Sequence, residues 1–116
     1  MAETIQITLD VHRISRKVER AWEAGLPQLS DEILNDCNQY CKMRSGALIA
    51  SSMTASNLDK GELIWDTPYA ARQYYEIETA YTDYNPNASW KWCEVAKANH
   101  LAKWNRQAQL LLEQNL

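Results

Sequence analysis

Phenylalanine is absent from this chain of 116 residues, and glycine and proline occur only three times each. So few glycines leave no glycine-rich loop of the kind that cradles phosphates. No apolar run approaches the roughly 20 residues that cross a bilayer, and no basic segment followed by an apolar core marks a secretory signal. The three cysteines are an odd number, which argues against a disulfide framework and favours a reducing compartment. We therefore expect no membrane partner.

The composition that remains is that of a folded protein, with 46% apolar and 23% charged residues. The length predicts a single domain over residues 1–116. Acidic residues outnumber basic ones by 15 to 12, which argues against direct DNA binding. The charge is uneven, because residues 59–87 are acidic while residues 12–23 and 88–116 are mildly basic. This pattern fits either a solvated mixed surface or faces that attract copies of the chain or a neighbour.

Alternating apolar and polar residues predict a small sheet. Residues 3–11 alternate strictly, which is typical of a half-buried strand. Residues 46–57 alternate with small side chains, and residues 61–67 contain three consecutive apolar residues. A turn between these two segments predicts a β-hairpin. We therefore predict an antiparallel sheet of three to four strands, and with the helices described next this gives an α+β fold.

Apolar residues spaced by three or four predict the helices. A long helix is expected over residues 15–42, kinked or broken near Pro27, because proline lacks an amide donor. A second long helix is expected over 88–115. Between them, Pro68 suits the first position of a short helix over 68–75. The two long helices should cover the sheet.

Few side chains suggest chemistry. Cys37 and Cys41 stand one helical turn apart and could share a metal with Cys93 or His100. Zinc sites normally use tighter Cys-x₂-Cys pairs, so buried structural roles are favoured for these side chains. No nucleophile arrangement and no pair of acid and base is recognisable. The sequence therefore predicts no enzymatic activity, no cofactor and no small-molecule substrate.

Tyrosine is concentrated in one part of the chain, with five of the six tyrosines within residues 69–84. Because phenylalanine is absent, we expect Tyr69 and one of Tyr74 or Tyr75 to pack inward. The later tyrosines stand in a polar segment, and exposed tyrosines are typical of protein interfaces. The predicted interface comprises Tyr75, Glu76, Glu78, Tyr81, Asp83 and Tyr84.

Several short motifs stand in order along the chain: Asp-Cys-x₂-Tyr-Cys at 36–41, Ser-Gly-Ala-Leu at 45–48, Gln-Tyr-Tyr at 73–75 and Trp-x-Trp-Cys-Glu at 90–94. With them, residues 30–106 resemble the minor capsid proteins of tailed bacteriophages and prophages. These in turn are similar to the head–tail joining, or tail-completion, proteins of long-tailed phages. The most specific motif is architectural and comprises Trp65, Asp66, Thr67, Pro68, Tyr69 and Ala70.

The resemblance implies a structural protein located in the virion, where it forms a homo-oligomeric ring at the neck. Its neighbours there would be phage proteins on the head connector or portal side and on the tail-tube side. The resemblance also implies no enzymatic activity and no cofactor. The alternative is a stand-alone module that binds nucleic acid or another protein. The feature that favours this alternative is a group of basic residues, Arg13, Arg16, Lys17 and Arg20.

Overall fold

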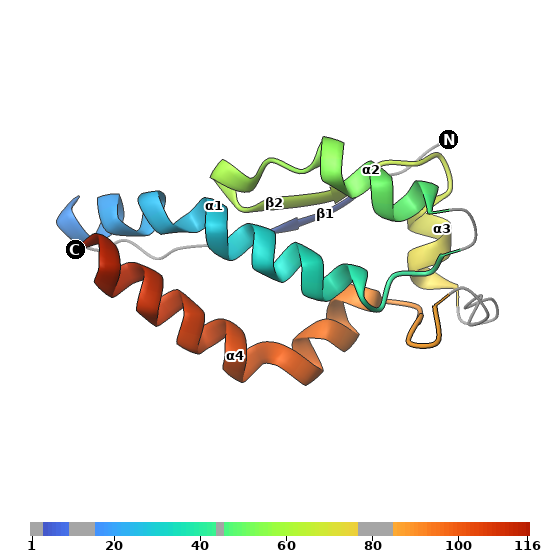
Figure 1. Cartoon of the computed structure of the whole chain (residues 1–116). Helices are drawn as coiled ribbons and strands as arrows, with labels where there is room; N and C mark the ends of the chain where they lie inside the picture. The colour runs from blue at the N-terminus through green and yellow to red at the C-terminus, as the bar shows by residue number, and fades with distance from the viewer. Residues whose placement is uncertain (1–3, 10–15, 44–45, 77–84) are drawn as a thin grey trace.

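The computed structural model describes residues 4–9, 16–43, 46–76 and 85–116 (Figure 1). Helix α1 lies between α4 on one side and the layer formed by the strands and α2 on the other (Figure 1). The predicted α+β class is confirmed, and most of the described residues are helical. The elements, in chain order, are β1 (Ile5–Thr8), α1 (Arg16–Asn38), α2 (Ala47–Ala55), the 3₁₀ turn η1 (Leu58–Lys60), β2 (Glu62–Trp65), α3 (Ala70–Tyr75) and α4 (Trp92–Asn115).

Within the described residues, the sheet has two strands instead of the predicted three to four. β1 and β2 pair antiparallel, with Ile5 opposite Trp65 and Thr8 opposite Glu62. The ladder continues one residue further, because the backbone N–H of Leu9 donates to the carbonyl of Gly61 at 2.8 Å. The strands predicted over 3–11 and 61–67 are thus present, with shorter bounds.

The prediction of a strand over 46–57 is wrong, because this segment forms helix α2. Its sequence, Ala-Leu-Ile-Ala-Ser-Ser-Met-Thr-Ala, is rich in alanine, the best helix former. Small side chains mask the period, and the two residues that α2 buries, Leu48 and Ser52, are one helical turn apart. The predicted hairpin of 46–57 with 61–67 is therefore wrong as well, and β2 pairs with the distant β1.

The two long helices are close to their predicted positions. α1 continues through Pro27 as a single helix, so a break into two consecutive helices is excluded. It ends at Asn38, before the predicted residue 42. The backbones of α1 and α4 approach each other closely at Gly25, where a Cβ atom would lie 3.1 Å from the Cβ of Leu111. Glycine permits this approach because it has no side chain.

α3 and α4 both begin later in the chain than predicted. α3 is preceded by a turn in which the N–H of Ala70 donates to the carbonyl of Thr67 at 3.0 Å, and its N-cap is Tyr69. α4 begins at Trp92, later than the predicted residue 88. The residue before it, Lys91, is in the left-handed region with φ 47°. The short and the second long helix are confirmed with these later starts.

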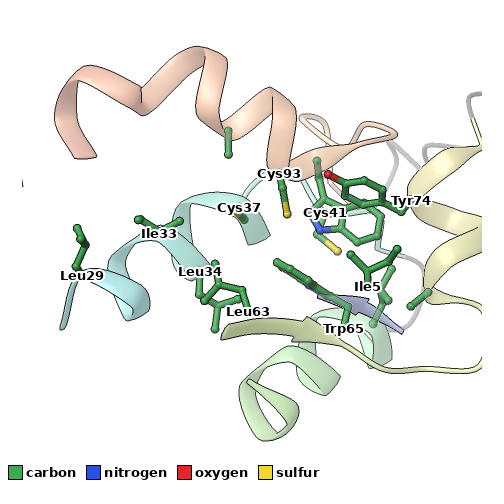
Figure 2. Close-up of a cluster of buried hydrophobic side chains, with 14 of the residues drawn as sticks. Ile5, Leu29, Ile33, Leu34, Cys37, Cys41, Leu63, Trp65, Tyr74 and Cys93 are labelled. Carbon is green, nitrogen blue, oxygen red and sulfur yellow. The ribbon is translucent and has the colours of Figure 1, made fainter. Parts of the chain in front are cut away.

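The core lies where the sheet meets α1, α3 and α4 (Figure 2). Leu63 and Trp65 of β2 point into it and are fully buried, as is Trp92 at the start of α4. The ring of Trp92 meets Trp65 edge-on at 5.8 Å and Tyr74 edge-on at 4.7 Å between centroids. Such pairs add about 0.5–1.5 kcal/mol each beyond the burial of their area. Three segments far apart in sequence are thereby joined. Among the described residues, no helix is long and apolar enough to cross a membrane.

Candidate functional site

The predicted interface residues begin where α3 ends. Glu78, Tyr81, Asp83 and Tyr84 lie outside the described residues. Tyr75 is 59% exposed, and the partly exposed Glu76 forms an ion pair with Arg72 one helical turn earlier, at 3.5 Å. The ring of Tyr75 also meets the ring of the buried Tyr74 edge-on, with 5.1 Å between centroids.

One short turn holds both residues that flank the segment 77–84. This turn, residues 39–42, follows the last residue of α1. On one flank, the ammonium of Lys42 donates to the carbonyl of Glu76. On the other flank, the side-chain amide of Asn85 donates to the carbonyls of Gln39 and Cys41, each at 3.0 Å. Residues 76 and 85 are therefore fastened to the same place.

The last carbonyls of α1, from Asn35 to Asn38, accept hydrogen bonds from the N–H groups of Gln39, Tyr40 and Cys41 in the turn. The carbonyls of the turn itself therefore need donors from elsewhere in the chain. Asn85 supplies two such donors, and the N–H of Ser89 supplies another to the carbonyl of Tyr40 at 2.9 Å. We call Lys42, Asn85 and the 39–42 turn the loop clamp.

Lys42 is the unusual member of the loop clamp. Its side chain is only 2% exposed, and buried lysines are rare because an ammonium loses its hydration on burial. Burial lowers the pKa of the Lys42 ammonium, while the charge of Glu76 acts in the opposite direction. Its hydrogen bond to Glu76 explains why a cation is tolerated inside the fold.

The predicted structural motif at 65–70 is the corner between β2 and α3. Trp65 and Ala70 are fully buried, and the indole N–H of Trp65 donates to the side-chain oxygen of Asn38 at 2.9 Å. Asn38 donates in turn to the hydroxyl of Ser52 at 2.9 Å. Trp65 thus joins β2 to the end of α1 and to α2. Asp66 and Pro68 are exposed and Thr67 is partly buried.

The prediction that Tyr69 and one of Tyr74 or Tyr75 pack inward is half correct. Tyr74 is buried, as expected for one of Tyr74 or Tyr75. Tyr69, however, is 41% exposed. Its place in the turn before α3 directs it away from the core, whereas the first buried residue of that helix is Ala70.

The cysteines occupy the core and show no metal geometry. All three are unpaired and buried, and Cys37 and Cys93 face each other beside Tyr74 (Figure 2). A hydrogen bond with Cys93, together with burial, raises the pKa of the Cys37 thiol. Thiols are weak nucleophiles and ligands while protonated. Among the described residues, no cluster of histidine, cysteine and acidic side chains could hold a metal ion.

A polar seam between α1 and α4 was missed at the sequence level. The carboxylate of Asp36 is buried and accepts hydrogen bonds from Lys103 at 2.9 Å and from the indole N–H of Trp104 at 2.7 Å. Burial alone would raise the pKa of Asp36, but these hydrogen bonds and the charge of Lys103 lower it below its usual value. His100 belongs to the same seam, with its Nε2 3.0 Å from the hydroxyl of Tyr40.

These contacts assign structural roles to most of the residues that could have suggested chemistry. His100 also stacks on Trp104, as expected for a histidine at the edge of a core. The partners of Asp36 are more than 60 positions away in sequence, so no local pattern reveals them. The one local signal is an acidic residue on a helix face that otherwise buries apolar side chains, beside Ile33 and Cys37.

Comparison with known proteins gives one match. The family model described as "Minor capsid protein" matches residues 5–110. The matched range includes the corner at 65–70, the loop clamp and most of α4. No curated protein and no solved structure matches the chain. Since the family model covers nearly the whole sequence, the chain belongs to the minor capsid protein family of bacteriophages, whose role is structural and whose place is the virion.

Proposed function

We propose that this minor capsid protein assembles as a ring at the head–tail junction of the virion, in a tail-completion role. Its neighbours would be proteins of the head connector or portal side and of the tail-tube side. Family membership supports the structural role and the virion location. The ring and its position in the neck go beyond the family match and rest on how the chain holds the segment 77–84.

The loop clamp is the observation that carries the proposal. It fastens residues 76 and 85 to one turn, so the two residues that flank the eight-residue segment are held at the same place. A segment with closely held ends loses less conformational entropy when it binds than a free tail of equal length. The proposed contacts are made by Tyr75, Glu76, Glu78, Tyr81, Asp83 and Tyr84.

A ring requires two different surfaces on each copy, so that every subunit meets the next head to tail. The acidic segment 77–84 supplies one surface, with Glu78 and Asp83 and no basic residue. Exposed basic residues of α4, among them Lys97 and Arg106, supply charge of the opposite sign. Opposite charges on the two surfaces favour the head-to-tail encounter and disfavour pairing of like surfaces.

The test is incorporation of a variant into virions. The double substitution Tyr81→Ser with Tyr84→Ser removes two large aromatic side chains outside the described core. We expect an unchanged melting temperature of the purified protein and a loss of the protein from purified particles, measured by quantitative mass spectrometry and electron microscopy. The matched control is Tyr69→Ser, which removes an exposed tyrosine outside the segment. Equal incorporation of the double variant and the control would contradict the proposed interface.

A further inference from the structure

The two outer edges of the sheet differ. The outer edge of β2 is covered, because the N–H of Ile64 donates to the hydroxyl of Ser56 at 2.9 Å. Next to it, Asn57 and Glu62 exchange two backbone hydrogen bonds of 2.8 and 2.9 Å. Ser51 accepts from the N–H of Asp66 at 3.3 Å. The chain that precedes β2 therefore occupies this edge along its whole length.

The described residues do not cover the outer edge of β1 in this way. In an antiparallel pair, alternate residues direct their backbone groups to the partner strand. Leu9 bonds to Gly61, so Ile5 and Ile7 also face β2, while the N–H and C=O groups of Gln6 and Thr8 point away from it. No described residue pairs with the backbone of Gln6 or Thr8. An uncovered edge of this kind is a template for another strand.

A groove of about 420 Å³ runs beside the uncovered strand, between β1, α1 and α4. Its walls are mainly apolar, and Leu101 of α4 stands 44% exposed on it. Glu94 and Lys97 lie on its polar rim. The groove continues the inner face of β1, where alternate side chains of an added strand would point. The apolar residues that line it include Ile7, Leu9, Trp22, Ile33, Leu101 and Ala108.

We propose that this groove receives residues 77–84 of a second copy of the chain, which pair with Gln6 and Thr8 as an added strand. The inference rests on the proposed ring and names the surface that the segment meets. Backbone groups of the edge would supply hydrogen bonds, and the groove would take alternate side chains, as in other cases of strand addition. One copy then offers the segment and the next offers the groove, which is the head-to-tail arrangement that a ring needs.

The sequence of the segment fits this occupant. Ile-Glu-Thr-Ala-Tyr-Thr-Asp-Tyr is rich in isoleucine, threonine and tyrosine, which favour strands. With a period of two, Ile77, Thr79 and Tyr81 share one face and would enter the groove. Asp83 falls on the same face and would approach the α4 side, where Lys97 lies on the rim, while Glu78 falls on the opposite face. Backbone hydrogen bonds, burial of apolar side chains and opposite charges would thus hold the segment in the groove.

The reach of the segment favours a second copy over the groove of the same chain. A Cβ atom at Gly61 would lie 2.9 Å from the side chain of Leu9 and 3.3 Å from that of Leu26. The Thr8 end of β1 therefore lies near Leu26. At 1.5 Å per helical residue, Leu26 is about 20 Å along α1 from the 39–42 turn. A segment held at 76 and 85 reaches out over only half its length, about 15 Å at most. The Thr8 end of its own edge is therefore out of range, so an added strand that pairs along both Gln6 and Thr8 requires the edge of a neighbour.

The test uses a synthetic peptide of residues 76–85, titrated into the full-length protein and followed by NMR. We expect the largest shift changes at the amides of Gln6, Thr8 and Leu101. Gln6→Pro removes the outward N–H and leaves the pairing with β2 intact, because proline is tolerated at an edge. Its control, Gln6→Ala, keeps that N–H. We expect the peptide to bind Gln6→Ala like the parent chain and Gln6→Pro at least tenfold more weakly.

Two results would overturn the inference: no binding to the parent chain at millimolar peptide, or equal binding to the two Gln6 variants. Melting curves establish whether both Gln6 variants fold. If Gln6→Pro does not fold, the same comparison is made with Thr8→Pro and its control Thr8→Ala. A mixture of Thr8→Cys and Glu78→Cys proteins, treated in assembled particles with a short thiol crosslinker, should give covalent dimers containing one of each. Crosslinks formed only within a Thr8→Cys/Glu78→Cys double variant would place the segment on its own chain.

The outcome separates this inference from the proposed function. If the parent protein is absent from purified virions, the proposed function fails whatever the peptide does. If the protein is present in a ring and Gln6→Pro is incorporated as well as Gln6→Ala, the ring stands and the strand addition is wrong.

Discussion

The loop clamp and the β1–α4 groove differ in whether their backbone polar groups have hydrogen-bond partners. At the clamp, Asn85 and Ser89 donate to the carbonyls of the turn that follows α1, and even the buried Lys42 has a partner. At the groove, the outward backbone groups of Gln6 and Thr8 have no partner among the described residues, and the walls that these residues form are mainly apolar. A chain that satisfies one region so completely and leaves the other open is asymmetric in the way that head-to-tail assembly requires.

The clearest way to break the closed region is to remove Trp65. Trp65→Ala deletes a fully buried indole, its edge contact with Trp92 and the partner of Asn38. We expect a loss of about 3–5 kcal/mol in the free energy of unfolding, because a large cavity and an unpaired amide remain. Urea denaturation measures it. A loss below about 1 kcal/mol would show that the corner at 65–70 is not the architectural centre.

A milder change tests the clamp itself. Asn85→Ala removes two hydrogen bonds to the 39–42 turn and leaves the carbonyls of Gln39 and Cys41 without that donor. We expect a loss of about 1–3 kcal/mol and reduced incorporation into virions. The control is Asn87→Ala, an exposed neighbour in the same turn. If the two variants behave alike in both measurements, Asn85 does not hold the segment.

The polar seam predicts a dependence of stability on pH. The pKa of Asp36 is lower in the folded chain than its ordinary value of about 3.9 in an unfolded one. The stabilisation is therefore complete above that ordinary value and is lost as the pH falls through the lower folded pKa. Because Lys103 is half exposed, we expect an effect of only about 1 kcal/mol. Melting between pH 7 and 2 should show less acid sensitivity in Asp36→Asn than in the parent chain. Equal sensitivity would contradict this role.

The smallest effect on stability is expected in the open region. Leu101→Ser changes an exposed wall of the groove, so the free energy of unfolding should change by less than about 0.5 kcal/mol. Incorporation into virions should nevertheless fall. Leu110→Ser is the matched control, because Leu110 is 49% exposed on the same helix but does not line the groove. Equal incorporation of both variants would show that the groove plays no part in assembly.

Local patterns predict much of this fold and little of its site. Periodicity locates β1, α1 and α4, because each has a clear apolar face, while a short apolar run locates β2 and Pro68 indicates the start of α3. It fails at 46–57, where alanine and serine are small enough to satisfy a strand or a helix and only packing decides. It fails also at Tyr69, whose exposure depends on the turn that precedes α3.

The parts of the site that escaped prediction depend on contacts across the fold. Lys42 meets a backbone carbonyl 34 positions later, and no side-chain pattern marks such a partner. The sequence places Asn85 in a surface turn, and nothing local indicates that its amide donates to the turn that follows α1. The groove exists only because β1 and α4, at opposite ends of the sequence, lie on either side of α1.

Electron microscopy of purified virions, at a resolution that traces the chain in the neck, is the most direct test of assembly. Head-to-tail assembly predicts a closed ring of copies at the head–tail junction, in which residues 77–84 of each copy lie along β1 of the next. A particle with the protein elsewhere, or a ring whose subunits meet through other surfaces while 77–84 face solvent, would contradict it.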